Sequence, residues 1–223
     1  VLASNDETFG AQMNILGLHT VWHDTGACLL TGDRMLAVSE ERLSREKYDG
    51  SFPKRSIDYV LSAAGFTDIN QMDLVVLDHL KDKAPKMHKE LTKFGYKGRV
   101  HFIDHHDSHA AGVYFQSGFD DAAILIVDGT GSLAHFSETG RPPHPLATGL
   151  PEPYELHSYY RGTGNRLFTI DKTWASADHR GSIGMFYDAV SYYCNFGPFG
   201  AGKVMGLASY GGKDPRSREI IYE

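Results

Sequence analysis

Histidine and carboxylate side chains with the spacing of metal ligands lie in the middle of the chain, in the segment HHDSHA that begins at His105. If a helix starts after Asp104, a good N-cap residue, His105 and His109 lie one turn apart on the same helix face. Asp128 follows the apolar stretch 122–127, which predicts a buried strand. In an open α/β sheet, ligands collect at the carboxyl ends of strands, so these three side chains could hold one divalent metal.

The same side chains also fit a purely structural role. In that interpretation His105 caps the helix and His109 is a half-buried, hydrogen-bonded histidine. The chain has 12 histidines, so a pair with this spacing can arise by chance. The residues alone leave both interpretations open. His106 shares its face with Ala110 and Val113, and we expect it to pack rather than to bind a metal.

A glycine-containing segment directly after the expected strand could approach a phosphate. Glycines let backbone amides come close to an anion, and a preceding carboxylate can bind a metal or its water. A plain hairpin turn is the alternative. The residues of this candidate nucleotide site after Asp128 are Gly129, Thr130, Gly131 and Ser132.

A second glycine-containing segment, Gly197–Val204, matches the pattern G-x-x-x-x-G-K of a phosphate-binding loop. Val204 stands where that motif needs a hydroxyl for magnesium, and the segment follows a helix instead of a strand, so we reject the motif. Gly202 and Lys203 at the start of a helix can still meet a phosphate, because free N–H groups there favour anions. A solvated Lys203 in an ordinary loop is the alternative.

Two further polar segments have a functional and a plain interpretation. His23 and Asp24 follow the first expected strand, and a histidine oriented by a carboxylate can act as a general base. An ordinary loop is the alternative. Most of the charged residues 40–47 are interpreted as a solvated helix face.

Hydrophobic periodicity and turn residues predict alternating strands and helices. An early hairpin interrupts the simple β-α order, so we expect an α/β lobe with a mixed sheet. The expected strands are 14–19, 27–30, 35–38, 73–77, 100–103, 122–127, 134–136, 154–160 and 167–173, and the expected helices are 56–64, 86–94, 105–117, 182–196 and 202–210.

Composition narrows the possible function classes. The formal net charge of −6 does not favour a nucleic-acid surface. Two cysteines make no disulfide framework and fit a reducing compartment, and no apolar run is long enough to cross a membrane. We therefore expect a cytoplasmic protein without a nucleic-acid or membrane partner. Residues 1–13 show no periodicity and are interpreted as a leading segment that is either disordered or not part of the natural protein.

Five segments in this order resemble the amino-terminal domain of the O-carbamoyltransferases that modify antibiotics, toxins and nodulation factors. The resemblance covers about residues 14 to 211, and HHxxHA together with GKVMGLA is its specific part. It implies a fold related to actin, Hsp70 and hexokinase and to the enzyme that transfers threonylcarbamoyl to tRNA. The segments are Leu16-Gly-Leu with His23-Asp24, Ser39-Glu-Glu-Arg42, HHDSHA, Val127-Asp-Gly129 and 202–211.

The resemblance implies a reaction and roles for the candidate residues. A second domain of such enzymes makes carbamoyl-adenylate from ATP and carbamoyl phosphate, and the domain seen here passes the carbamoyl group to a hydroxyl of a small molecule. His105, His109 and Asp128 would hold a divalent metal, iron first and zinc or manganese as alternatives. His23 would lie near the acceptor hydroxyl and Asp188 would help to hold the acceptor, with the DGTGS segment and Gly202-Lys203 along the nucleotide.

The resemblance also implies that residues 14–223 are the amino-terminal part of a carbamoyltransferase domain, incomplete at the C-terminal end. The family's second α/β half carries a further metal carboxylate, and the adenylate-forming domain follows it. We expect the remainder of the same polypeptide or a second subunit as a partner, and no carbamoyl transfer by this chain alone. A non-catalytic nucleotide-binding module or subunit of the same superfamily is the alternative, whereas a sugar kinase fits the two histidines poorly.

Overall fold

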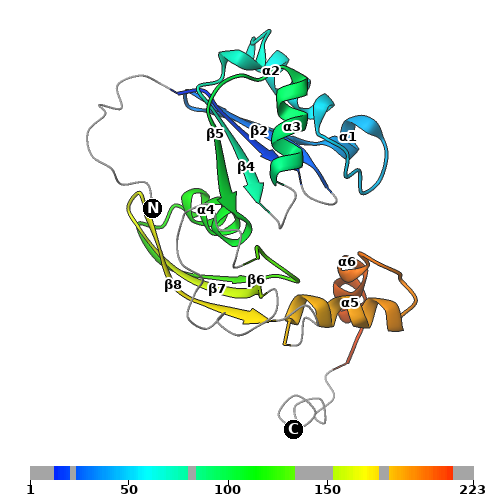
Figure 1. The fold of residues 1–223 in the computed structure, drawn as a ribbon. Coiled ribbons are helices and arrows are strands. Elements are labelled where there is room, and N and C mark those ends of the chain that lie inside the picture. The colour runs from blue at the N-terminus through cyan, green and yellow to red at the C-terminus, as the bar shows by residue number, and fades with distance from the viewer. Residues whose placement is uncertain (1–12, 21–23, 80–83, 134–152, 176–180, 213–223) are drawn as a thin grey trace.

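The computed structural model describes residues 13–20, 24–79, 84–133, 153–175 and 181–212 of the chain. Two β-sheets form two lobes, and one helix, α4 (His105–Ser117), lies between them (Figure 1). The expected leading segment and the strand expected at 134–136 lie outside the described residues. None of the helices within the described ranges is long and apolar enough to cross a bilayer.

The first lobe has a five-stranded mixed sheet with the order β3-β2-β1-β4-β5. The first three strands pair antiparallel, and β4 and β5 continue the sheet parallel to β1. The early hairpin and the mixed sheet predicted from the sequence are therefore confirmed. The strands are β1 (Ile15–His19), β2 (Gly26–Thr31), β3 (Arg34–Ser39), β4 (Leu74–His79) and β5 (Val100–Asp104).

One face of this sheet carries the apolar core of the first lobe. Alternate strand residues such as Leu16, Leu29 and Leu77 are fully buried there, as the period of two in a strand requires. Helices α2 (Lys54–Ala64) and α3 (Ala84–Phe94) pack on this face through their own apolar stripes. Both helices end at glycines with positive φ, Gly65 and Gly95, a conformation that favours glycine.

The short helix α1 (Glu40–Ser44) contains an exception to the solvated face expected for most of residues 40–47. Its first residue, Glu40, is only 3% exposed. Its carboxylate accepts hydrogen bonds from the backbone N–H groups of Arg55 and Ser56 at 3.1 and 2.8 Å and from the Ser56 hydroxyl. Glu40 thus satisfies the free amides at the start of α2, a role that spacing along the sequence does not show.

The second lobe has its own three-stranded antiparallel sheet with the order β6-β7-β8. Its strands are β6 (Asp121–Val127), β7 (Tyr154–Thr163) and β8 (Arg166–Ala175). The sequence placed Asp128 at the end of the next strand of one sheet, but β6 belongs to this separate sheet. The two strands lie on opposite sides of α4, with β5 above the helix and β6 below it in Figure 1.

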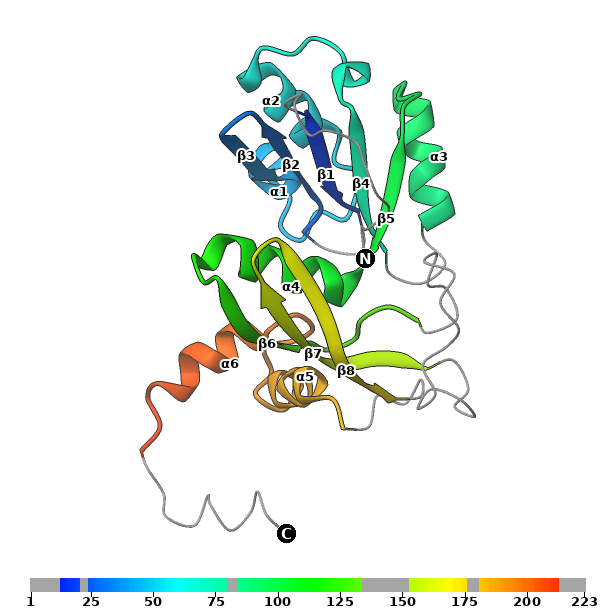
Figure 2. The ribbon, with the colours of Figure 1, turned by 90° about the vertical axis from the view of Figure 1, so that its left-hand side faces the viewer.

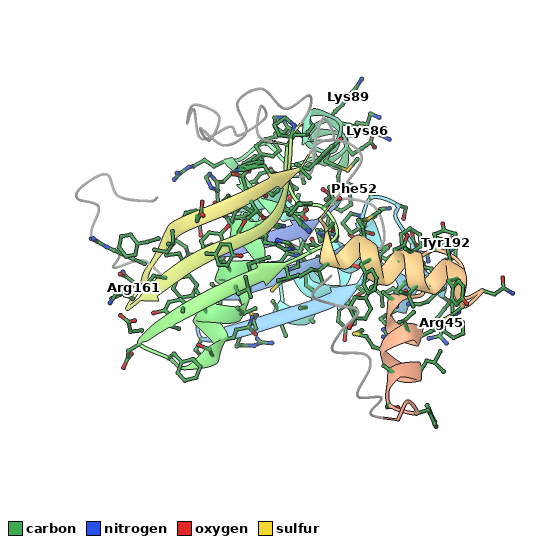
Figure 3. The ribbon with its side chains drawn as sticks, turned by 90° about the horizontal axis from the view of Figure 1, so that it is seen from below. Arg45, Phe52, Lys86, Lys89, Arg161 and Tyr192 are labelled. Atoms are coloured by element: carbon green, nitrogen blue, oxygen red, sulfur yellow. The ribbon has the colours of Figure 1, made fainter. Side chains whose placement is uncertain are left out.

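Helix α4 packs on one face of the second sheet, and the other face is open in the described part of the chain. Ala110 and Tyr114 of α4 contact Ile124 and Ile126 of β6 in a small apolar cluster. Figure 2 shows α4 between the two sheets, and Figure 1 shows α5 (Ile183–Tyr193) and α6 (Ala201–Ala208) beside one end of the second sheet. Figure 3 shows the second sheet from below, on the side away from α4.

Candidate metal centre and its surroundings

The two histidines at the start of α4 and the carboxylate after β6 converge, as the sequence predicted. His105 Nε2 lies 2.9 Å from Asp128 Oδ2 and 3.2 Å from His109 Nε2. His109 Nε2 lies 3.9 Å from the same carboxylate oxygen. Metal–ligand bonds of about 2.0–2.2 Å place neighbouring ligand atoms roughly 2.8–3.6 Å apart. The two separations from His105 lie within this range and the third is slightly longer, so a small movement of His109 would let the three atoms share one ion.

The chemistry of this donor set suits a divalent transition metal. Two imidazoles and one carboxylate bind iron, zinc or manganese. Burial and the neighbouring charge on His105 lower the pKa of His109, which keeps its lone pair free for a metal. Burial alone would raise the pKa of Asp128, but the hydrogen bond from His105 and its charge hold that pKa below the usual range. The residues present therefore fit the implied metal.

The N-terminus of α4 is capped from the second lobe and not by its own N-cap side chain. Asp104 occupies the N-cap position, yet its side chain makes no capping hydrogen bond. The His105 backbone N–H instead donates to the Ser132 hydroxyl at 3.0 Å. Ser132, predicted as a nucleotide ligand, is buried and fastens α4 to the loop that carries Asp128.

A second carboxylate, Asp78, lies behind His105 and was not predicted. Asp78 hydrogen-bonds His19 Nδ1, and its Oδ2 lies 3.7 Å from His105 Nδ1. Burial would raise the pKa of Asp78, but the two imidazoles hold it well below the usual range. Burial would lower the pKa of His105, but Asp128 and Asp78 together raise it to about 9.

The parallel pairing of three strands explains why these residues meet. Leu18 of β1 pairs with Leu77 of β4, and Asp78 pairs with Ile103 of β5, so the ends of the three strands share one edge. The signal that could have found Asp78 is its place at the carboxyl end of a strand expected at 73–77. An acidic residue at such a strand end is too common to be assigned without knowing the strand order.

Beneath α4 the second sheet presents a buried polar network. Lys172 forms an ion pair with Glu155, which is only 1% exposed. The Lys172 Nζ also lies 3.3 Å from the carboxylate of Asp107 in α4. The Tyr160 hydroxyl donates to the same Asp107 carboxylate at 2.6 Å. Burial would lower the pKa of Lys172, but the charges of Glu155 and Asp107 outweigh it and raise that pKa.

His106 belongs to this network, and its expected packing role is confirmed. It is fully buried, and its Nδ1 lies 2.7 Å from the Ser158 hydroxyl. Burial lowers the pKa of His106 to about 3, which keeps the ring neutral. A Cβ on Gly131 would lie 2.6 Å from His106 Nε2, so glycine at 131 permits this close contact. Val113, expected on the packed face with His106, is 53% exposed.

The loop after Asp128 also anchors α5. The Ser182 hydroxyl donates to the Gly129 carbonyl at 2.9 Å and accepts from the Met185 N–H at 3.1 Å. A Cβ on Gly184 would clash with the Gly129 nitrogen, so the start of α5 lies directly against this loop. Asp188, the predicted acceptor ligand, is half-buried further along α5.

The remaining predicted residues have separate places. Gly202 and Lys203 are exposed in the first turn of α6, and Lys203 Nζ lies 5.9 Å from the centre of the Phe196 ring. Thr130 is half-buried in the loop after β6. His23 lies outside the described residues. The structure thus brings the three candidate metal ligands together, and their role as ligands stays a prediction, as do the roles of Lys203, Asp188 and His23.

A cleft of about 620 Å³ adjoins the candidate centre on the first lobe. It lies along the face of the first sheet that the core helices leave uncovered. Its lining includes His19 and Asp78, Arg42 of α1 and Ser108 of α4. The cleft therefore lies at the carboxyl ends of the parallel strands, and polar and charged side chains form part of its lining.

The chain matches one protein-family model and several curated relatives. The family described as "Carbamoyltransferase N-terminus" matches residues 14–94 and 86–223. Protein sll1178 of Synechocystis, described as uncharacterized, is 30% identical over 251 residues, covering 94% of this chain and 36% of the relative. Nodulation protein NolNO of Sinorhizobium fredii is 30% identical over 230 residues, covering 92% and 30%. The chain thus spans about a third of the length of these relatives.

The solved structures that match the chain include one bacterial protein. YeaZ from Pseudomonas aeruginosa superimposes with a TM-score of 0.46 at 12% identity, covering 73% of this chain and 66% of that protein.

Proposed function

The chain belongs to the carbamoyltransferase family as its amino-terminal domain, and from this premise we propose that it transfers a carbamoyl group from carbamoyl-adenylate to a hydroxyl of a small-molecule natural product. The observation that carries the proposal is the convergence of His105, His109 and Asp128 within 4.8 Å of one another. ATP and carbamoyl phosphate are the co-substrates from which the adenylate is made, and their supply favours the cytoplasm.

The metal ligands have the first role in this proposal. His105, His109 and Asp128 hold a divalent cation, iron first and zinc or manganese as alternatives. When bound, such an ion supplies Lewis-acid stabilisation of negative charge on the adenylate phosphate. Ser132 and the network around Lys172 keep the start of α4, and with it both histidines, in place.

The transfer itself needs a base and an orientation of both substrates. The acceptor oxygen forms a bond to the carbamoyl carbon while the bond from that carbon to the phosphate oxygen breaks, and AMP leaves with the electron pair. His23 takes the proton of the hydroxyl, and Asp188 holds the acceptor. Backbone amides from Gly129 to Ser132, together with Gly202 and Lys203, bind the nucleotide phosphate.

A partner completes the site in this proposal. The relatives are about three times as long as the chain, and we assign adenylate formation and a further metal carboxylate to the remainder of the same polypeptide or to a second subunit. Exposed apolar residues of the second sheet support a covering partner on the face away from α4. They include Leu125 (58% exposed), Val127 and Tyr159.

The reaction can be tested on the 223-residue chain and on the complete polypeptide or complex that contains it. Each is supplied with ATP, carbamoyl phosphate, a divalent metal and a panel of polyhydroxylated acceptors. The complete protein is expected to release AMP together with a product heavier by one carbamoyl group, and the chain alone to release neither.

Two results would contradict this scheme. Robust turnover by the chain alone would overturn the division of labour between the two parts. Nucleotide binding by the complete protein without any product would support the alternative, a non-catalytic nucleotide-binding module.

A further inference from the structure

A buried carboxylate lies on the side of His105 that faces away from the candidate metal. Asp78 is 7% exposed, and both of its oxygens are engaged. Oδ1 accepts a hydrogen bond from the Thr20 N–H at 3.1 Å, and Oδ2 bonds His19 Nδ1. The same Oδ2 lies 3.7 Å from His105 Nδ1. Asp78 is therefore held in one orientation by β1 and points at the second nitrogen of a candidate ligand.

The nitrogen that Asp78 faces is buried and has no hydrogen-bond partner among the described residues. A buried polar atom of this kind is costly unless it is paired, and here the nearest anionic group is the Asp78 carboxylate. The 3.7 Å separation is longer than a hydrogen bond. Because the last torsion of a histidine side chain is broad, a small rotation of the ring brings the two groups together.

We infer that Asp78 is a positioning residue for His105, which holds the proton on Nδ1 and so leaves Nε2 free to bind the metal. A neutral imidazole has one N–H and one lone pair, and the hydrogen bond at one nitrogen decides which nitrogen carries the lone pair. Ligating histidines commonly donate their other N–H to a carboxylate, which also fixes the ring orientation. The inference rests on the proposed metal site and adds a residue to it.

His19 has a supporting part in this arrangement. Its Nδ1 shares Oδ2 of Asp78 with His105, and the centres of the two rings lie 6.4 Å apart. His19 is also partly exposed and lines the cleft beside the centre. One carboxylate is thus shared by two imidazoles at the ends of neighbouring parallel strands. If Asp78 only joined β1 to β4, its hydrogen bonds with Thr20 and His19 would be sufficient, and its carboxylate would not have to lie close to His105.

The substitution Asp78→Asn separates positioning from structural support. The single amide oxygen of Asn can keep the hydrogen bond from Thr20, which leaves the amide N–H₂ group facing the two imidazoles. A donor at His105 Nδ1 favours the lone pair on that nitrogen and the proton on Nε2, the wrong form for the site. We expect the affinity for Zn²⁺, measured by calorimetry, to fall by about 10- to 100-fold.

Asp121→Asn is the matched control, since Asp121 bonds Arg161 and Thr163 at the exposed far end of the second sheet. It is expected to bind Zn²⁺ like the parent. Unchanged affinity in Asp78→Asn, with the parent binding one ion, would overturn this inference and leave the metal site standing. If the parent binds no Zn²⁺, the metal site and this inference both fail.

A measurement on the unmodified chain keeps the inference testable if Asp78→Asn does not fold. In the zinc-loaded protein labelled with ¹⁵N, long-range ¹H–¹⁵N spectra identify which imidazole nitrogen carries a proton. His105 is expected to show a protonated Nδ1 that exchanges slowly with water. A His105 ring protonated at Nε2, with zinc on Nδ1, would contradict the role assigned to Asp78.

Discussion

The face of the first sheet that α2 and α3 cover differs in chemistry from the face of the second sheet on which α4 packs. In the first lobe, α2 and α3 cover the sheet through apolar side chains, with Leu16, Ile57 and Leu77 fully buried. In the second lobe, the first turn of α4 packs on charged and hydroxyl groups of the sheet. Among these groups, Glu155 and Ser158 are almost completely buried. The helix that carries the candidate metal ligands thus has an extended polar network beneath its first turn.

This difference indicates what each region is built for. Apolar packing is strong but non-directional, so it stabilises the first lobe without specifying the direction of any polar group. Hydrogen bonds and ion pairs require defined geometry, and a fully connected buried network rigidifies its surroundings. The network around Asp107 and Lys172 therefore fixes the rotation of α4, which decides where His105 and His109 point.

The largest loss of stability is expected from breaking the buried polar network beneath α4, at the ion pair of Lys172 and Glu155. Lys172→Met leaves Glu155 buried without its partner, and removing one member of a buried pair costs about 3–5 kcal/mol of unfolding free energy. Urea denaturation measures this loss, and zinc affinity should fall with it. The control Lys93→Met removes an exposed pair with Glu90 and should cost less than about 1 kcal/mol. Equal losses in the two variants would remove the distinction between the regions.

An apolar deletion in the first lobe should cost stability without touching the metal centre. Ile57→Ala removes a fully buried side chain, for which about 2–5 kcal/mol is expected. Zinc affinity, measured well below the melting temperature, should stay within twofold of the parent. A drop in affinity as large as that of Lys172→Met would show that the first core positions the ligands as well.

A smaller effect is expected at the cap of α4. Ser132→Ala removes the acceptor of the His105 N–H and should cost about 0.5–2 kcal/mol, as N-cap deletions do. Ser62→Ala, at an exposed position of α2, serves as the control and should stay within about 0.5 kcal/mol of the parent. Loss of stability in the control alone would contradict the capping role of Ser132.

The smallest effect is expected on the open face of the second sheet. Leu125→Ser should change the stability of the 223-residue chain by less than about 0.5 kcal/mol, because Leu125 is 58% exposed. Its neighbour Ile124 faces α4, and Ile124→Ala should cost about 2–5 kcal/mol. Thermal melts of both variants, repeated in the complete protein, test the covering partner. A Leu125→Ser penalty that does not grow there would argue against it.

The sequence predicted local features well, because local chemistry decides them. The early hairpin, the helix beginning at His105 and the glycines that end α2 and α3 follow from periodicity and from backbone preferences of single residues. The convergence of His105 and His109 with Asp128 was also predicted, although β6 lies in a second sheet.

The features that were missed depend on contacts between distant segments. Glu40 caps a helix 14 residues further along, counted from Glu40 to Lys54. Ser132 caps α4 across 27 residues, and Asp78 meets His19 across 59. Nothing in the local pattern distinguishes these residues from ordinary surface residues, because strand order and the packing of two sheets on α4 bring them together.

Metal binding by the 223-residue chain tests the central claim most directly. Elemental analysis and calorimetry compare the parent, the double variant His105→Ala/His109→Ala, and the control His88→Ala/His101→Ala, which removes two exposed histidines. The account predicts one divalent ion per chain in the parent and the control, and none in the variant without His105 and His109. Equal metal content in all three proteins would contradict it.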